Sequence, residues 1–397
     1  MTGRLAITGV SGHVGRLIVP FLAGAGIELV LVGRDPSRIR ELFPGHPVFA
    51  YDELGVALAD CDAVLHLAVR NNDSSASLDE MRAVNVDFLL QVATAARGAG
   101  IRKFINATTI HALDPGRGDP YSRTKREGEH ALAEVSGMDI VQLRLPSVYA
   151  DRFGGRLRWL DRLPSFARKP ASRIAGALRP IVHAERIAEA VLGIIDGELA
   201  GEVICVDPQE DNRVYRLARR CLDLAFVVAV VAILGWLMIL VWIAIRLTSP
   251  GPGLFAQPRV GRRERVFTCY KFRTMAVGTP QAGTHEVAPS RITPLGRVLR
   301  RTKIDELPQV WNVARGEMSV VGPRPCLPNQ TELIEWRRKL GVFQSTPGIT
   351  GLAQVQGVDM SRPEELARLD ARYCSLRTLS LDMRLAVATI IGGRAAT

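Results

Sequence analysis

Cysteine is scarce in this chain of 397 residues, and its positions form no pattern typical of disulfide cross-links or of a metal site. The six cysteines are scattered, and no two of them form a Cys-x-x-Cys pair. A disulfide framework and a structural zinc site are therefore both disfavoured, and a reducing compartment is the default expectation. A signal peptide is not indicated either, because the opening MTGRLAITGVSG has the character of a strand and a turn.

Acidic side chains become scarce in the second half of the chain. Residues 1–212 contain 24 Lys and Arg against 27 Asp and Glu, whereas residues 213–397 contain 27 against 13. The net charge of +11 therefore arises in the second half, and it indicates nucleic acid, a lipid surface or a phosphorylated substrate as partner. No nucleic-acid partner is expected, because aromatic side chains for base stacking do not interleave with the basic clusters.

Charge is missing altogether from Leu224 to Ile245, LAFVVAVVAILGWLMILVWIAI. This run of about 22 residues is long enough to cross a bilayer, and it has no polar face. Positive charge normally marks the cytoplasmic end of a membrane segment, yet arginines flank this run on both sides. A hairpin that enters and leaves the same leaflet satisfies both flanks, and Gly235 offers a place to bend. The flanking arginines are Arg213, Arg216, Arg219, Arg220, Arg246, Arg259, Arg262, Arg263 and Arg265.

Three regularly spaced glycines follow the first apolar stretch of the chain. Leu5–Thr8 has the pattern of a strand, and Gly9, Gly12 and Gly15 lead from it into a helical stretch. Glycine at these positions allows a tight turn and lets the backbone approach a pyrophosphate at the helix N-terminus. The spacing alone is weak evidence, because any strand-to-helix turn can use glycine. The strand before it and a second strand after the helix, ELVLVGR, strengthen it.

The end of that second strand bears on the choice of cofactor. An acidic side chain there would bind a ribose hydroxyl, whereas an arginine would bind a 2′-phosphate. Arg34 therefore favours NADP, while Asp35 beside it leaves NAD open. Further strands separated by helical stretches predict an alternating α/β domain with a parallel sheet. These strands are expected at residues 63–68, 103–109 and 139–145.

The segment PYSRTKREGEHAL supplies an acid/base pair. Tyr121 and Lys125 are four residues apart and therefore share one face of a helix. A lysine ammonium near a phenol favours the phenolate, which would make Tyr121 an acid/base group near neutral pH. Thr109, at the end of the preceding strand, could donate a hydrogen bond to a substrate carbonyl. Without the glycine turn upstream, a solvated helix face would be the better interpretation.

With that turn, the first half resembles the extended short-chain dehydrogenase/reductases, a family of NAD(P)-dependent sugar-nucleotide epimerases, dehydratases and reductases. The resemblance covers about residues 2–205, through TGVSGHVG, DAVLHLA, YSRTK and LRLPSVYADR. It implies that Thr109, Tyr121 and Lys125 are catalytic and that Asp52 contacts adenine. The part that binds substrate is shortened relative to the family. Whether this domain reduces, epimerises or does not react is therefore left open.

The second half contains two adjacent carboxylates, Asp305 and Glu306, just ahead of Pro308. Acids and proline are common in the first turn of a helix, so an isolated Asp-Glu-x-Pro is most simply a helix start. The surrounding motifs change this interpretation. YKFRTM, KIDELPQVWNVARGEMSVVGPRP and PGITGLAQVQG occur in order, and with them residues 214–391 closely resemble the small monotopic phosphoglycosyl transferases, a bacterial sugar-transferase family.

That resemblance implies a reaction of a UDP-sugar with undecaprenyl (polyprenol) phosphate, giving polyprenol-diphosphate-sugar and UMP. Asp305, with Glu306 beside it, would attack the phosphorus that carries the sugar and form a covalent phosphosugar. A carboxylate is a weak nucleophile, so Mg²⁺, with Asp305 as a ligand, and fixed cations would have to neutralise the diphosphate. The family breaks its membrane helix at a Ser-Pro pair, where this chain has Gly235 and Trp236. The expected phosphate-binding cations are Lys271, Arg273, Arg301 and Arg324.

The whole sequence thus predicts an α/β chain in three parts. These are a Rossmann-like doubly wound parallel sheet (residues 1–212), a re-entrant membrane helix (213–247) and a small, mainly helical α+β catalytic domain (248–397). We expect a bifunctional enzyme on the bacterial inner (cytoplasmic) membrane, monotopic, with both domains in the cytoplasm. Its partners would be a UDP-sugar, polyprenol phosphate and membrane lipid, with Mg²⁺ and NADP (or NAD) as cofactors, and a homo-oligomer is left open.

Two alternatives remain at this point. The first domain could be a non-catalytic binding or oligomerisation module attached to the transferase. The chain could instead be a membrane-tethered reductase whose basic half only binds lipid, which would make the Asp-Glu motif incidental.

Overall fold

The structure is a computed structural model, and it describes residues 3–71, 76–150, 153, 155–279 and 291–392. The chain divides into two compact units, with the boundary between Pro208 and Gln209. The sequence places this boundary after residue 212, at the start of the long apolar helix. Each unit is described separately below.

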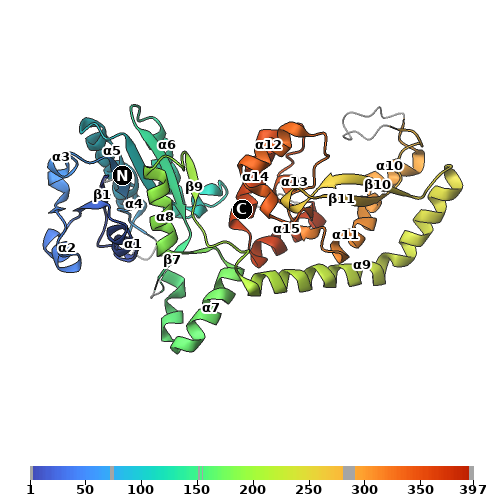
Figure 1. Ribbon diagram of the computed structural model, residues 1–397, viewed down its shortest axis with the longest axis horizontal. Coiled ribbons are helices and arrows are strands. Elements are labelled where there is room, and N and C mark those ends of the chain that lie inside the picture. Colours follow the sequence, from blue (N-terminus) through green and yellow to red (C-terminus); the bar gives the residue numbers. More distant parts are fainter. Residues whose placement is uncertain (1–2, 72–75, 151–152, 154, 280–290, 393–397) are drawn as a thin grey trace. The chain divides into compact units, whose positions relative to one another are not determined.

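A seven-stranded sheet forms the centre of the first unit (Figure 1). All of its pairings are parallel, and the strand order is β3-β2-β1-β4-β5-β6-β9. The order reverses between β1 and β4, which is the point where doubly wound sheets bind nucleotides. The strands are β1 (Arg4–Thr8), β2 (Glu28–Val32), β3 (Val48–Phe49), β4 (Ala63–His66), β5 (Lys103–Thr109), β6 (Asp139–Leu145) and β9 (Glu202–Ile204).

Helices cover both faces of this sheet, so its strands are apolar on both sides. Leu5 and Ile7 of β1 pack with α1 and α8 on one face, whereas Ala6 packs with α3 and α5 on the other. This alternation follows from the two-residue period of a strand. The helices are α1 (His13–Gly24), α2 (Pro36–Leu42), α3 (Leu54–Ala57), α4 (Leu78–Arg82), α5 (Leu89–Gly98), α6 (Pro120–Ala133) and α8 (Ala184–Ile195).

A small second sheet in this unit carries an insertion that projects away from the main sheet (Figure 1). Strands β7 (Ser147–Tyr149) and β8 (Ile181–His183) pair in parallel. The chain between them contains the short helix η4 (Gly155–Arg162) and the helix α7 (Ser165–Leu178). The doubly wound parallel domain is therefore confirmed, while β7, β8 and β9 were not among the strands that we expected.

The second unit combines the long helix α9 (Arg213–Thr248) with a mainly helical domain and an antiparallel hairpin. Its core includes the buried ion pair between Arg337 and Asp370, 2.6 Å apart, which joins α12 to α14. The hairpin is β10 (Leu254–Val260) and β11 (Val266–Phe272). The other elements are α10 (Pro294–Arg301), η7 (Ile304–Gln309), α11 (Val310–Ala314), β12 (Ser319–Val321), α12 (Thr331–Lys339), β13 (Gly348–Thr350), α13 (Leu352–Val355), α14 (Pro363–Leu376) and α15 (Leu379–Ile391).

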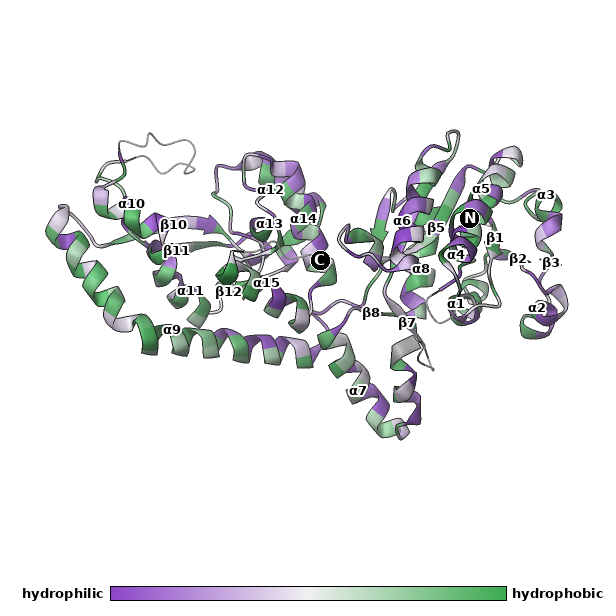
Figure 2. Ribbon diagram, turned by 180° about the vertical axis from the view of Figure 1, so that it is seen from behind, coloured by the Kyte–Doolittle hydropathy of each residue, from purple (hydrophilic) through white to green (hydrophobic). Residues whose placement is uncertain are grey.

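Within the described part of the chain, α9 is the one helix that is long and apolar enough to cross a membrane. Figure 2 shows much of its ribbon in green, the colour of hydrophobic residues, and Figure 1 shows that its axis bends part-way along. The helix remains α-helical through Gly235 and Trp236, so the bend does not interrupt it. The Trp236 indole Nε1 donates to the carbonyl of Ile233, 2.8 Å away, and a carbonyl that takes a second donor tilts outward and favours curvature.

Both ends of the apolar run in α9 pack against the same unit. Ahead of the run, the Asp223 carboxylate accepts hydrogen bonds from the Ser319 hydroxyl and the Val320 amide, each at 2.9 Å. At its other end, Val241 and Ile245 are buried against side chains of β11 and α10. The apolar side chains between these anchors are mostly exposed, which is the surface expected of a helix that lies in lipid.

Candidate active sites

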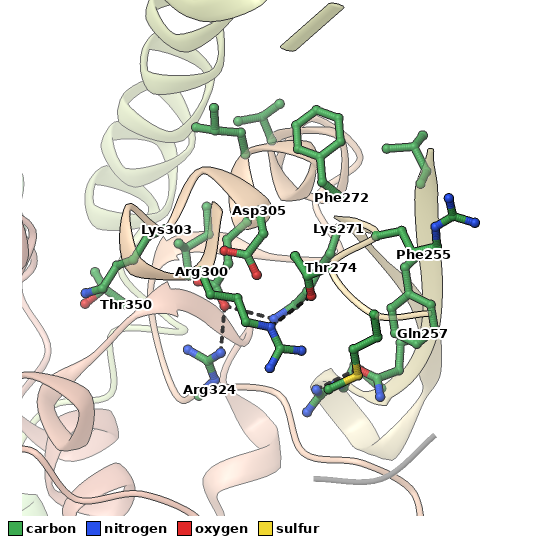
Figure 3. A pocket seen from close by; sticks show the side chains of 18 of the residues that line it. Phe255, Gln257, Lys271, Phe272, Thr274, Arg300, Lys303, Asp305, Arg324 and Thr350 are labelled. Atoms are coloured by element: carbon green, nitrogen blue, oxygen red, sulfur yellow. Dashed lines mark hydrogen bonds and ion pairs between the residues drawn. The ribbon is translucent and has the colours of Figure 1, made fainter. Parts of the chain in front are cut away.

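A cavity of about 800 Å³ opens in the second unit between the β10–β11 hairpin, η7 and the loop after β12 (Figure 3). That volume is typical of small-molecule sites. Phe226, Phe255 and Phe272 contribute apolar surface to its wall. Among the described residues that line it, Asp305 and Glu306 are acidic and a larger set is basic. The basic lining residues are Arg259, Lys271, Arg273, Arg300, Lys303 and Arg324.

The two carboxylates lie in the first turn of η7, a short 3-10 helix. Lys303, which precedes this turn, has a φ of 57°, a left-handed backbone conformation that residues other than glycine rarely adopt. No side chain caps η7. The Asp-Glu-x-Pro motif does lie at a helix start, as the ordinary explanation has it. The carboxylate of Glu306, however, does not cap this helix, and it bonds to side chains from other segments.

Glu306 binds two cations from separate segments of the chain. Its Oε1 accepts from Lys271 Nζ on β11 at 2.8 Å and from Arg324 Nη2, in the loop after β12, at 2.7 Å. Burial by itself raises the pKa of Glu306, but Arg324 and Lys271 outweigh it and lower the pKa to about 2. Glu306 is therefore a permanent carboxylate that holds both cations at the cavity.

Asp305 lies beside this network in a different electrostatic environment. Burial raises the pKa of Asp305, repulsion from Glu306 adds to the rise, and Lys271 and Arg300 oppose it. Among the described residues, no other side chain donates a hydrogen bond to its carboxylate, and Figure 3 shows Asp305 among the side chains that line the cavity. Asp305 is thus the carboxylate of the pair that is available to a ligand.

Of the four expected phosphate-binding cations, Lys271, Arg273 and Arg324 line the cavity, and Arg301 does not. Arg301 is exposed and does not line the cavity, whereas Arg300 does, with its Nε donating to Thr274 Oγ1 at 2.9 Å. Successive residues of a helix point about 100° apart, so only one of the two can face inward. Arg273 lines the cavity, but its two terminal nitrogens donate to the carbonyls of Ser249 (2.8 Å) and Pro250 (2.6 Å). Arg273 therefore fastens the end of α9 to β11.

Arg259 is a cavity residue that the sequence reasoning missed. Its terminal nitrogens donate to Pro325 O (2.9 Å) and Gln257 Oε1 (2.7 Å), while its Nε is buried without a partner among the described groups. Burial lowers the pKa of Arg259, and neighbouring Arg324 lowers it further. An anion in the cavity would relieve this repulsion. The period-two pattern of β10 could have indicated the site, because Gln257 and Arg259 share one face of the strand.

The donor set suits Mg²⁺ only when a substrate phosphate completes it. No cluster of three or more His, Cys, Asp or Glu side chains that could hold a metal occurs among the described residues. Mg²⁺ commonly binds one or two carboxylates together with substrate phosphates. Asp305 fits that role, and Glu306 would reach the ion only through its second oxygen, since Oε1 is bound to Lys271 and Arg324.

In the first unit, the glycine turn has the close packing that a dinucleotide site requires. Gly9 has a φ of 75°, and a Cβ there would lie 2.5 Å from the backbone nitrogen of Ala68. A Cβ on Gly15 would lie 2.5 Å from the carbonyl oxygen of Val10, so only glycine lets α1 approach the turn after β1 this closely. Gly12 is the N-cap of α1, and no side chain caps the helix. The first-turn N–H groups are therefore open to a pyrophosphate.

The residues expected near the adenosine half lie at the ends of β2 and β3. Arg34 is exposed, and its charge acts on the phenol of Tyr51. Asp35 caps α2 by accepting from the amide of Arg38 at 3.1 Å, so its carboxylate is partly engaged. Asp52 is exposed in the short helix Tyr51–Glu53 that follows β3. These positions fit the adenosine half of a nicotinamide dinucleotide.

Thr109 is the last residue of β5, and Tyr121 and Lys125 lie in the N-terminal half of α6. Lys125 Nζ donates to the carbonyl of Ala107 in β5 at 2.9 Å, and burial lowers its pKa to about 8. Burial raises the pKa of Tyr121 to about 12, with a further rise from Asp119. Burial and Asp119, and not Lys125, thus set the direction in which the pKa of Tyr121 is shifted. Thr109 accepts from the amide of His111, which leaves its hydroxyl proton free to be donated.

Asn85 is a second residue that pattern reasoning did not assign a role. Its side chain bonds both the amide and the carbonyl of Arg70 (2.9 and 3.0 Å) and also Thr124 Oγ1 (3.0 Å). It lies in a π-helical segment, Ala83–Phe88, an irregularity that is common near functional sites. Asn85 thus fixes the loop after β4 against α6. A buried asparagine in a helical stretch is the only sequence signal it gives.

Comparison with protein families assigns each unit separately. Residues 5–206 match the NAD dependent epimerase/dehydratase family, and residues 214–393 match the family described as bacterial sugar transferase. The chain belongs to both families. The fusion of two enzyme folds that the motifs predicted is confirmed.

Characterised relatives match the second unit. A UDP-glucose:undecaprenyl-phosphate glucose-1-phosphate transferase of Caulobacter vibrioides is 36% identical, over 44% of this chain and 68% of that protein. A UDP-N-acetylgalactosamine-undecaprenyl-phosphate N-acetylgalactosaminephosphotransferase of Aeromonas hydrophila is 33% identical, over 46% of this chain and 44% of that protein. The match thus spans less than half of the Aeromonas protein.

The first unit is similar in fold to a solved UDP-N-acetylglucosamine 4-epimerase from Bacillus cereus. The sequences are 18% identical, the TM-score is 0.40, and the match covers 51% of this chain and 75% of that one.

Proposed function

We propose that the protein transfers a sugar-1-phosphate from a UDP-sugar to polyprenol phosphate and releases UMP, in bacterial glycan assembly. The observation that carries the proposal is the Asp305 carboxylate, which no described side chain binds, in a cavity where basic lining residues outnumber acidic ones. Relatives named for this reaction support it. The cavity volume also suits a nucleotide-sugar.

The chemistry proceeds in two displacements at phosphorus. An Asp305 oxygen attacks the phosphorus that bears the sugar, the bond to the UMP oxygen breaks, and UMP leaves with that electron pair. Arg259, Arg300 and Arg324 are placed to stabilise the negative charge that grows on the phosphoryl oxygens. The phosphate oxygen of the polyprenol then attacks the same phosphorus, and Asp305 leaves as a carboxylate. When bound, Mg²⁺ supplies further neutralisation of the diphosphate.

The membrane placement that accompanies this reaction is re-entrant, on the bacterial inner membrane, with both units in the cytoplasm. The anchoring of both ends of the apolar run to one compact unit supports it, because a span would carry the ends to opposite surfaces. Basic residues flank the apolar run on both sides, which agrees with both of its ends lying on the cytoplasmic side of the membrane. A UDP-sugar and a nicotinamide dinucleotide are both cytoplasmic.

The first unit acts, on this proposal, as an NAD(P)-dependent reductase or epimerase of a UDP-sugar. Tyr121 is the acid/base, Lys125 orients it and the cofactor, and Thr109 donates to the substrate carbonyl. The intact glycine turn and the placement of these three side chains support activity. The substrate-binding part, which is shortened relative to the family that the first half resembles, favours the second candidate, a binding or oligomerisation module without catalysis.

Intact-protein mass spectrometry tests the transferase proposal. The full chain in detergent is incubated with Mg²⁺ and a panel of UDP-sugars, without polyprenol phosphate. A mass gain of one phosphosugar is expected with the correct donor, and it should disappear in the isosteric Asp305→Asn variant. The same samples should release UMP in step with the adduct.

An adduct that persists in Asp305→Asn would overturn the assignment of the nucleophile. UMP release without any adduct would overturn the covalent mechanism. Absence of both with every sugar, including UDP-4-keto-sugars supplied with NADPH, would count against the transferase proposal itself.

A further inference from the structure

The insertion between β7 and β8 carries an apolar stripe that faces outward. Phe166, Pro170, Ile174 and Leu178 of α7 are spaced four residues apart, so they lie along one side of the helix. All four are exposed, and Phe166 retains 82% of its surface. Trp159, in η4 just before α7, is 55% exposed. Soluble surfaces rarely align large apolar side chains in this way.

A neighbouring side of α7 makes the packing contacts of the helix, and the apolar stripe is left uncovered. Ala171 and Ala175 pack against a buried cluster of Phe153, Leu157, Leu160 and Ile181. Figure 1 shows η4 and α7 projecting together away from the main sheet. The outward side of α7 is therefore free to contact a surface beyond its own unit.

Basic side chains border this stripe. Residues 155–180 contain seven Lys and Arg and one acidic residue, whereas the remainder of residues 1–212 contains 17 basic and 26 acidic residues. The single acid, Asp161, is directed inward and accepts from the amide of Phe153 at 3.0 Å. The exposed cations are Arg158, Arg162, Lys169, Arg173 and Arg179.

We propose that α7 docks on the surface of an anionic lipid leaflet, which gives the first unit a membrane contact of its own. An apolar helix side bordered by Lys and Arg, with aromatic residues along it, is the composition of an interfacial helix. The apolar side chains enter the headgroup region, while the cations stay at the level of the lipid phosphates.

Charge and connectivity favour lipid over the other possible occupants. A second copy of the chain would bring two strongly basic faces together, which costs free energy. A soluble phosphorylated ligand would use the cations but would leave Phe166 and Ile174 in water. The chain also runs from this unit directly into α9, so a leaflet occupied by α9 is present at high local concentration.

Because α9 anchors the protein in any case, the test must report on α7 itself. The full chain is placed in nanodiscs of phosphatidylglycerol or of phosphatidylcholine, with the photo-crosslinker benzoylphenylalanine at Phe166. The matched control carries the crosslinker at Val56 of α3, which is 67% exposed in the same unit. Mass spectrometry then separates lipid adducts from protein adducts.

Lipid adducts at Phe166 are expected in phosphatidylglycerol, with few in phosphatidylcholine and few at Val56. Each basic charge near an anionic surface changes affinity about fivefold, so Lys169→Glu with Arg173→Glu should reduce the adducts at least about tenfold. Arg97→Glu with Arg102→Glu, exposed positions elsewhere in the unit, should leave them unchanged.

Three results would overturn the proposal. These are equal lipid adducts at Phe166 and Val56, equal adducts in the two lipids, and predominant crosslinking of Phe166 to a second protein chain. The phosphosugar adduct of the second unit, measured on the same variants, should remain unchanged, because α7 takes no part in that reaction. Failure of the lipid-docking proposal can thus be distinguished from failure of the transferase proposal.

Discussion

Asp305 and Glu306 are neighbours in sequence, yet their surroundings push their pKa values in opposite directions. Two cations lower the pKa of Glu306 to about 2, whereas burial and the charge of Glu306 raise that of Asp305. A pair of carboxylates separated in this way can divide its roles, one fixing cations and the other reacting. The residue-scale consequence is a defined dependence of the reaction on pH.

The rate of phosphosugar adduct formation should fall on acidification at a pH above the ordinary titration range of aspartate. Only the ionised carboxylate attacks phosphorus, and a raised pKa means that protonation of Asp305 begins at a higher pH. In Glu306→Gln the like charge is gone while Lys271 remains, so the acidic limb should move to lower pH. Single-turnover rates by intact mass across the pH range measure this, and an unshifted or upward-shifted limb would contradict it.

Tyr121→Phe should lower NAD(P)-dependent turnover of a UDP-sugar by about 10²- to 10⁴-fold, the usual contribution of a general acid/base. Dinucleotide binding should be retained, because the substitution leaves the glycine turn unchanged. Adduct formation on Asp305 provides the internal control, since it occurs in the other unit. Turnover that survives in Tyr121→Phe would remove the catalytic assignment, and absence of turnover in the unaltered protein would favour the binding-module alternative.

At the scale of elements, sequence patterns predicted the long strands with a clear apolar pattern, and they missed the short strands whose pairing depends on tertiary contacts. Strands β5 and β6 have the bounds that were expected, because each is a buried apolar run between turn signals. The pairs β7–β8 and β6–β9 were not expected, since three residues carry too little periodicity to be recognised. Arg300 and Arg301 illustrate the same limit at the site. Which of two neighbouring helical residues faces the cavity depends on how the helix packs, and the sequence pattern does not give this.

The turn between β1 and α1 gives a prediction at this scale. Gly15→Ala would place a Cβ 2.5 Å from Val10 O and should destabilise the first unit by about 1–3 kcal/mol, as other overpacked sites do. Dinucleotide binding should weaken with it. Gly24→Ala in the same helix is the matched control, because nothing lies within 4 Å of its Cβ and alanine favours helix. Thermal unfolding and dinucleotide titration of both variants measure the difference, and equal behaviour would refute the close-packing argument.

For the whole molecule, the decisive fact is that two families are joined in one chain. A product released by the first unit would meet the second at a local concentration set by the linker. If the first unit makes the donor sugar, the joined chain should form polyprenol-diphosphate-sugar faster than its separated halves mixed at equal concentration. The gain should vanish when the donor is supplied in excess. Equal rates from joined and separated halves would show that the fusion serves another purpose.

The anchoring of α9 by Arg273 has a further consequence. The same side chain that binds the carbonyls at the end of the helix, Ser249 and Pro250, lines the reaction cavity. With α9 seated in one leaflet as proposed, the depth of the helix and the height of the cavity cannot vary independently. A lipid-linked acceptor would then reach Asp305 by lateral diffusion alone, and its search for the enzyme would take place in two dimensions.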